Sequence, residues 1–111
     1  MNKKDVVITG AARTPVGSFQ GVLSTESAPR LGSIAIKAAI EKSNIKPEDI
    51  DDVIMGCVLP AGMGQAPARQ AAIGANIPVS TGATTINKMC GSGMRSAMLA
   101  NDQIIAGSSS I

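Results

Sequence analysis

The sequence of 111 residues contains no histidine, tyrosine or tryptophan, and only one phenylalanine. Without histidine, the chain cannot build a Ser-His or Cys-His catalytic pair by itself. Without tyrosine, it cannot use a mechanism that needs a phenol. Aromatic side chains normally supply much of a core's buried area, so small aliphatic residues must fill the core here. A free-standing domain of this kind would be only marginally stable, and we expect it to pack against further polypeptide.

Strong charge and long hydrophobic runs are also missing. The net charge is +2, from 10 basic and 8 acidic residues, and no run of Lys or Arg predicts a nucleic-acid surface. The apolar stretch before Gly10 is too short for a signal peptide, and no stretch is long enough to span a membrane. We therefore expect a soluble, cytoplasmic protein without a nucleic-acid or membrane partner.

The only cysteines are Cys57 and Cys90. Their spacing matches no zinc pattern and no histidine could complete one, so no metal site is expected. A disulfide between them is not expected in a reducing cytosol. Each cysteine therefore needs its own explanation.

Strand and helix patterns alternate along the chain. Ser27 is a candidate cap for a helix that begins near Pro29, and Asn44 with Pro47 should end that helix. Gly107 is the expected stop of the last helix. Hydrophobic periodicity predicts strands over residues 5–11, 52–59 and 83–89, and further helices over residues 67–75 and 92–106.

The predicted order is β-α-β-α-β-α over one domain, residues 1–111. This order favours an α/β layer with mainly parallel strands and right-handed crossovers. The last helix carries an apolar face formed by Met94, Ala97, Met98, Ile104 and Ile105. Because the strand that should follow Gly107 is missing, we expect strand edges and apolar helix faces to be unpaired.

Cys90 lies where the third predicted strand ends and the last helix begins. The strand would hold the backbone in place, and Gly91 and Gly93 allow a tight turn that a substrate can approach. Free N–H groups at the start of a helix favour thiolate over thiol. The same groups, with the backbone N–H of Cys90, are candidate donors to an oxyanion. The alternative is that Cys90 is a small buried hydrophobic residue.

The segment around Cys90 favours the catalytic interpretation. Residues 87–96 (NKMCGSGMRS) closely resemble the active-site cysteine signature of thiolases. Residues 8–18 (ITGAARTPVGS) and 55–72 (MGCVLPAGMGQAPARQAA) resemble that family's opening strand and its second strand, loop and helix, in the same order. The resemblance covers essentially the whole chain. The Cys-Gly-Ser-Gly run is more similar to the biosynthetic acetoacetyl-CoA branch than to the degradative branch.

The resemblance implies an acyltransferase with a thiolase-like N-terminal fold. Cys90 would attack acetyl-CoA, forming acetyl-Cys90, and a second acetyl-CoA would then give acetoacetyl-CoA in a ping-pong reaction. Coenzyme A thioesters would be substrates, and no separate cofactor would be needed. The family also implies a homo-oligomer.

Thiolases are several times longer than this chain. Their loop domain and C-terminal domain are absent, together with the Gly-His-Pro motif that activates the nucleophile and the Cys-x-Gly-Gly-Gly motif that supplies the acid/base cysteine. Cys57 does not replace that second cysteine, and we interpret it as a packing residue. The isolated chain is therefore expected to be inactive, whether it is a fragment, a degraded reading frame or one part of a split enzyme that pairs with a C-terminal chain.

Other functions were considered. Residues 83–89 could pair with another thiolase chain, which would make the protein a non-catalytic interaction module. Residues 7–13 (VITGAAR) resemble the start of a short-chain dehydrogenase, but Thr14 and Val16 stand where that motif needs glycine, and the catalytic tyrosine is missing. A ketoacyl synthase fits the Cys90 segment less well than a thiolase.

The remaining signals have structural interpretations. Lys88 and Arg95 are interpreted as solvated or structural, and the loop 62–65 as a strand-to-helix connection. Four methionines could line an acyl pocket, but we favour a role as core filler for Met63, Met89, Met94 and Met98.

Overall fold

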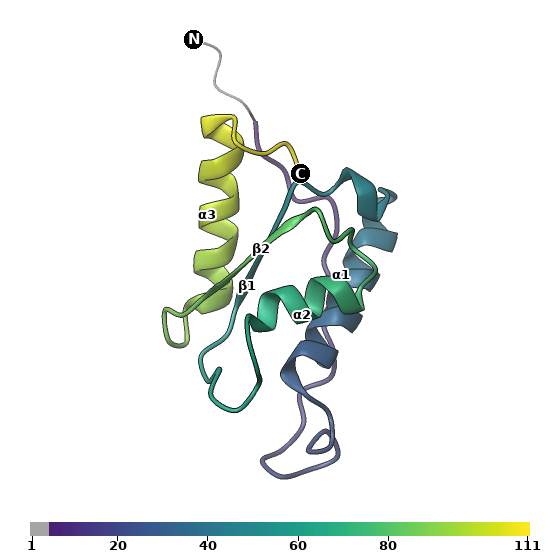
Figure 1. Cartoon of the computed structure of the whole chain (residues 1–111), viewed down its shortest axis with the longest axis vertical. Coiled ribbons are helices and arrows are strands. Elements are labelled where there is room, and N and C mark those ends of the chain that lie inside the picture. The colour runs from purple at the N-terminus through teal and green to yellow at the C-terminus, as the bar shows by residue number, and fades with distance from the viewer. Residues whose placement is uncertain (1–4) are drawn as a thin grey trace.

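The structure is a computed structural model and describes residues 5–111 (Figure 1). A short 3₁₀ helix, Pro47–Asp49, follows the first α-helix. The two strands pair in parallel, with Asp52 opposite Gly82. The expected α/β class with parallel strands is therefore confirmed. The main elements are α1 (Ala28–Ser43), β1 (Asp52–Gly56), α2 (Pro67–Gly74), β2 (Gly82–Ile86) and α3 (Ser92–Ala106).

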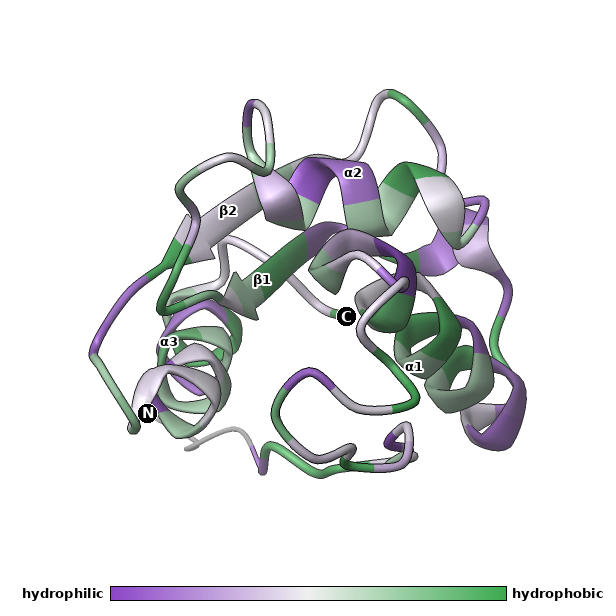
Figure 2. Ribbon diagram, turned by 90° about the horizontal axis from the view of Figure 1, so that it is seen from below, coloured by the Kyte–Doolittle hydropathy of each residue, from purple (hydrophilic) through white to green (hydrophobic). Residues whose placement is uncertain are grey.

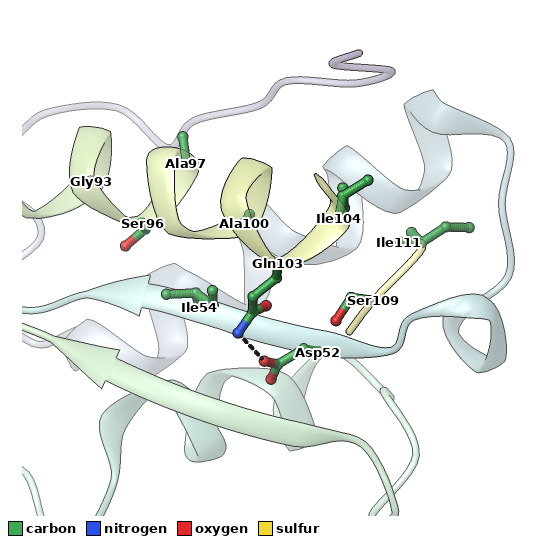
Figure 3. Close-up of a pocket in the computed structure, with 10 residues that line it drawn as sticks. All are labelled: Asp52, Ile54, Gly93, Ser96, Ala97, Ala100, Gln103, Ile104, Ser109 and Ile111. Atoms are coloured by element: carbon green, nitrogen blue, oxygen red, sulfur yellow. Dashed lines mark hydrogen bonds between the residues drawn. The ribbon is translucent and has the colours of Figure 1, made fainter. Parts of the chain in front are cut away.

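The helices lie on both faces of the small sheet. α3 packs against β1 on one face, whereas α2 covers the other face and contacts α1 (Figures 1 and 3). Hydrophobic residues are concentrated on β1 and α1, while β2 is paler in the hydropathy colouring (Figure 2). The core accordingly lies between α1, α2 and β1, and its buried members are Ile40, Val53, Ala72 and Ile77.

The predicted helix ends are confirmed. The Ser27 hydroxyl oxygen accepts a hydrogen bond from the Arg30 N–H at 3.2 Å, which caps α1. Asn44 closes α1 in the left-handed conformation with φ 54°, and Gly107 closes α3 with φ 84°. These ends depend on residues close in sequence, so local patterns were sufficient to find them.

The first predicted strand is wrong. Residues 5–11 form no ladder within the part of the chain that the structure describes, and Val7 and Ile8 are 71% and 86% exposed. The segment is instead attached to α1, where the Lys42 ammonium donates to the Ala11 carbonyl oxygen at 3.0 Å. A β-branched run predicts an extended backbone, but a strand also needs a partner.

The other two strands are shorter than predicted. β1 ends at Gly56 rather than at residue 59, although the Cys57 N–H still donates to the Ile86 carbonyl oxygen at 2.9 Å. β2 ends at Ile86 rather than at residue 89, because Met89 has a left-handed backbone with φ 49°. The left-handed region is incompatible with an extended strand.

The apolar face of α3 is largely exposed, as expected for helix faces that lack the missing strand. Met94, Met98 and Ile105 are 75%, 50% and 46% exposed, whereas the buried residues of α3 are Ser92 and Ser96. α3 therefore packs on the sheet through its small residues, and this allows the helix and the sheet to approach each other closely. The methionine side of α3 is left without a partner among residues 5–111.

Candidate active site

Cys90 lies at the carboxyl edge of the sheet. Because β1 and β2 run parallel, the segments that follow them meet at the same end, and Cys57 leaves β1 where Asn87 leaves β2. A side-chain hydrogen bond from Asn87 Nδ2 to the Val58 carbonyl oxygen, 3.2 Å long, joins these two segments. Cys90 itself is exposed. Residues 5–111 therefore do not bury this thiol.

The backbone before Cys90 makes a sharp turn. Met89 is left-handed, a conformation that costs a residue with a β-carbon roughly 1–2 kcal/mol. Two backbone bonds close the turn: the Gly91 N–H donates to the Lys88 carbonyl oxygen, and the Ser92 N–H donates to the Met89 carbonyl oxygen, each at 3.1 Å. The turn lifts Cys90 out of the sheet and starts α3 immediately behind it.

Two side chains complete the hydrogen bonding of this turn. The Ser92 hydroxyl accepts from the Lys88 N–H at 2.8 Å and donates to the Met89 carbonyl oxygen at 2.6 Å. Asn87 Oδ1 accepts from the Met89 N–H at 2.9 Å. Ser92 is 3% exposed, so its hydroxyl is shielded from competing water. The left-handed residue is thus bonded through both its N–H and its carbonyl group.

The helix that follows has an uncapped N-terminus. Gly91 is the N-cap residue of α3, and no side chain accepts a hydrogen bond there. Within residues 5–111, the Cys90 N–H also has no acceptor, in contrast to the N–H groups of Lys88, Met89, Gly91 and Ser92. Backbone donors next to an exposed thiol can bind an oxyanion that forms on an attacked carbonyl group.

Cys57 has a different environment. Its side chain is half-buried, with Sγ 4.0 Å from Met63 Sδ, and it lines a small hollow of about 50 Å³ together with Pro67 and Ala68. These surroundings are apolar. They agree with the interpretation of Cys57 as a packing residue.

Several other predicted residues lie at the surface. Lys88 is exposed and Arg95 is half-buried, which agrees with their solvated or structural interpretation. The core-filler interpretation of the methionines is wrong for three of the four, because Met89, Met94 and Met98 are 67%, 75% and 50% exposed. Only Met63 is partly buried.

A separate cleft of about 310 Å³ runs between α3 and β1 (Figure 3). Its α3 wall carries Gly93, Ser96 and Ala100, and at its end Gln103 Nε2 donates to Asp52 Oδ2 at 3.2 Å. Cys90 does not line this cleft. The cleft thus lies along the buried side of α3, away from the Cys90 thiol.

Residues 5–111 form neither a metal site nor a membrane-spanning helix. No group of three His, Cys, Asp or Glu side chains there is arranged to hold a metal ion. No helix in the same range combines the length and the hydropathy needed to cross a membrane.

The sequence predicted that Cys90 lies between a strand and a helix, as the structure shows, but it gave no part to Asn87, Met89 and Ser92. The signal for Asn87 and Ser92 was their position on either side of the cysteine, since Asn and Ser often bond to nearby backbone groups. The left-handed Met89 had no local signal, because methionine does not favour that conformation.

Comparison with known proteins agrees with the resemblance to thiolases found in the sequence. The thiolase N-terminal domain family matches residues 6–111. A mitochondrial acetyl-CoA acetyltransferase of Danio rerio is 59% identical over 103 residues, which is 93% of this chain and 24% of the relative. A cytosolic acetyl-CoA acetyltransferase of Gibberella zeae is 51% identical over 110 residues, 99% of this chain and 28% of the relative.

A solved structure agrees. The Acat5 thiolase of Ascaris suum, crystallised in complex with coenzyme A, superposes with a TM-score of 0.91 at 42% identity. The alignment covers 94% of this chain and 27% of the Ascaris chain. The chain therefore spans about a quarter of the length of the relatives that it matches.

Proposed function

Because the chain belongs to the thiolase family, whose N-terminal domain it matches, we propose that it supplies the nucleophile, Cys90, for acyl transfer between coenzyme A thioesters. The observation that carries the proposal is the exposed thiol at the start of α3, behind a left-handed Met89. A nucleophile needs both access to substrate and nearby donors for the charge that develops.

The first half-reaction uses residues of this chain. The Cys90 thiolate attacks the carbonyl carbon of acetyl-CoA, and the Cys90 N–H donates to the oxygen that becomes negative. The bond from the carbonyl carbon to the sulfur of coenzyme A then breaks, and coenzyme A leaves as a thiolate. The acetyl group remains on Cys90 Sγ. No cofactor beyond the thioester substrate enters this step.

The second half-reaction needs a base that this chain does not hold. A second acetyl-CoA must lose a proton from its methyl carbon, and the carbanion then attacks acetyl-Cys90 to give acetoacetyl-CoA and the free thiolate. The sequence contains no histidine, and Cys57 lies half-buried beside Met63. We therefore expect the 111 residues alone to be inactive in forming or cleaving the carbon–carbon bond.

A mixing experiment tests the proposal. The chain is combined with a polypeptide that carries the Gly-His-Pro and Cys-x-Gly-Gly-Gly segments of a thiolase, and cleavage of acetoacetyl-CoA by coenzyme A is followed. We expect activity in the mixture and none in either part, with loss on Cys90→Ser and retention on Cys57→Ser. Activity that survives Cys90→Ser would rule out Cys90 as the nucleophile.

A second candidate is a non-catalytic subunit or fragment that pairs with a thiolase chain. The exposed side chains Met94, Met98 and Ile105 favour it, since large apolar groups on one helix usually meet a partner. A homo-oligomer would cover them as well. Binding to a complete thiolase without any dependence of activity on Cys90 would support this candidate over the first.

The cellular location stays a prediction. The two relatives described above are a mitochondrial and a cytosolic enzyme. The cytoplasmic location expected from the sequence is therefore not decided by the resemblance.

A further inference from the structure

The left-handed conformation of Met89 needs an explanation in the structure. A residue with a β-carbon prefers other conformations, so the turn before Cys90 would relax unless its neighbours stabilised it. The other left-handed residues with a β-carbon include Asn44, which closes α1 as a C-cap. Met89 is not a cap residue and lies two residues before Gly91, the N-cap of α3.

The bonds to Met89 come from side chains on both sides of Cys90. Asn87 Oδ1 accepts from the Met89 N–H at 2.9 Å, and the Ser92 hydroxyl donates to the Met89 carbonyl oxygen at 2.6 Å. The Ser92 hydroxyl also accepts from the Lys88 N–H at 2.8 Å. Both peptide groups that flank the Met89 α-carbon are therefore bonded to these two side chains.

We propose that Asn87 and Ser92 are positioning residues for Cys90. They hold Met89 in the left-handed conformation, and this fixes the thiol and the Cys90 N–H at the uncapped start of α3. The hydrogen bonds of both side chains go to backbone groups and none goes to the Cys90 thiol, so both act through the backbone. The inference rests on the proposed role of Cys90 as nucleophile.

A neighbouring serine provides a matched control. Ser96 is 7% exposed and Ser92 is 3% exposed, and both belong to α3. The Ser96 hydroxyl donates to the Ser92 carbonyl oxygen at 3.0 Å, one helical turn away, and makes no bond to Lys88 or Met89. Ser96→Ala therefore removes a buried helical hydroxyl without removing a bond to Lys88 or Met89.

The experiment measures the alkylation rate of each cysteine in the 111-residue chain. Iodoacetamide is added at neutral pH, and the modified Cys90 and Cys57 peptides are quantified over time by mass spectrometry. The variants are Ser92→Ala, Asn87→Ala and Ser96→Ala, each also combined with Met89→Gly. Cys57, being half-buried, reports loss of the fold in the same molecule.

We expect Ser92→Ala and Asn87→Ala to lower the Cys90 rate about fivefold, the scale set by an unfavourable left-handed residue. Ser96→Ala should leave it within about twofold of the parent rate. Met89→Gly should restore most of the lost Cys90 alkylation rate in both variants, because glycine enters the left-handed region without a steric penalty. If Asn87 or Ser92 only stabilised the fold, Met89→Gly would not restore the Cys90 alkylation rate.

Other alkylation results would contradict the positioning role or the nucleophile itself. An unchanged Cys90 rate in both variants, an equal loss in Ser96→Ala, or no rescue by Met89→Gly would overturn the positioning role. If Ser92→Ala unfolds the chain, the Cys57 rate will rise, and the exposed Asn87 then decides the question through Asn87→Ala. A parent Cys90 rate no higher than that of Cys57 would instead contradict the proposed nucleophile.

Discussion

The backbone of Ser92 lies directly against Gly56, the last residue of β1. A β-carbon on Gly56 would come within 2.7 Å of both the carbonyl carbon and the β-carbon of Ser92. The start of α3 therefore rests on the end of β1, and the glycine makes this approach sterically feasible. This contact sets the distance between the sheet and the turn that carries Cys90.

Gly56→Ala should destabilise the chain by about 2 kcal/mol, because the new methyl group must displace helix backbone rather than a flexible side chain. Urea denaturation followed by circular dichroism measures the change. The matched control is Gly93→Ala in the first turn of α3, where an added β-carbon meets nothing within 4 Å. That change should stabilise the chain by about 0.5 kcal/mol, and equal losses in the two variants would contradict the account.

Arg69 should stabilise the approach to β2. Its guanidinium donates to the carbonyl oxygens of Val79 and Thr81, each at 2.6 Å. Arg69→Ala should cost about 2 kcal/mol, since hydrogen bonds from a charged donor are stronger than neutral ones. Arg69→Lys should recover less than half of this loss, because lysine has no planar fork of donors. Full recovery with lysine would show that charge alone matters.

The pKa of Asp51 is lowered from 3.8, because its carboxylate accepts the backbone N–H of Ser110 and, more weakly, that of Ile111. A lowered pKa means that the carboxylate stabilises the folded chain above 3.8 and that this stabilisation is lost as the pH falls through the folded value. The Ser110 amide resonance should thus stay constant at neutral pH and move only below 3.8.

Asp51→Asn is the control for this titration. The amide keeps a hydrogen-bond acceptor but does not ionise, so the shift of the Ser110 resonance in acid should disappear. A shift that persists in this variant would assign the titration to another group.

Features that depend on residues close in sequence could be predicted from the sequence. Ser27, Asn44 and Gly107 act within one helical turn, and the helix ends they predicted are confirmed. The position of Cys90 between a strand and a helix was also predicted correctly, because the strand pattern stops and glycines follow.

Features that need distant partners were not predicted. Residues 5–11 have the composition of a strand, but pairing is a tertiary property that composition does not supply. The apolar face of α3 was predicted, but not that Ser92 and Ser96 form the side that packs on the sheet, because this depends on the close contact with Gly56. The left-handed Met89 depends on two side chains folding back onto the turn, so no propensity of its own residue predicts it.

The central claim is that Cys90 accepts an acyl group from a coenzyme A thioester. The most direct measurement incubates the chain, combined with a polypeptide that carries the Gly-His-Pro and Cys-x-Gly-Gly-Gly segments, with acetyl-CoA, digests the mixture under acidic conditions and assigns acetylation to the individual cysteines of this chain by mass spectrometry. The account predicts an acetyl group on Cys90, none on the half-buried Cys57, and no acetylated cysteine in Cys90→Ser. Acetylation of Cys57 alone, or of neither cysteine, would contradict it.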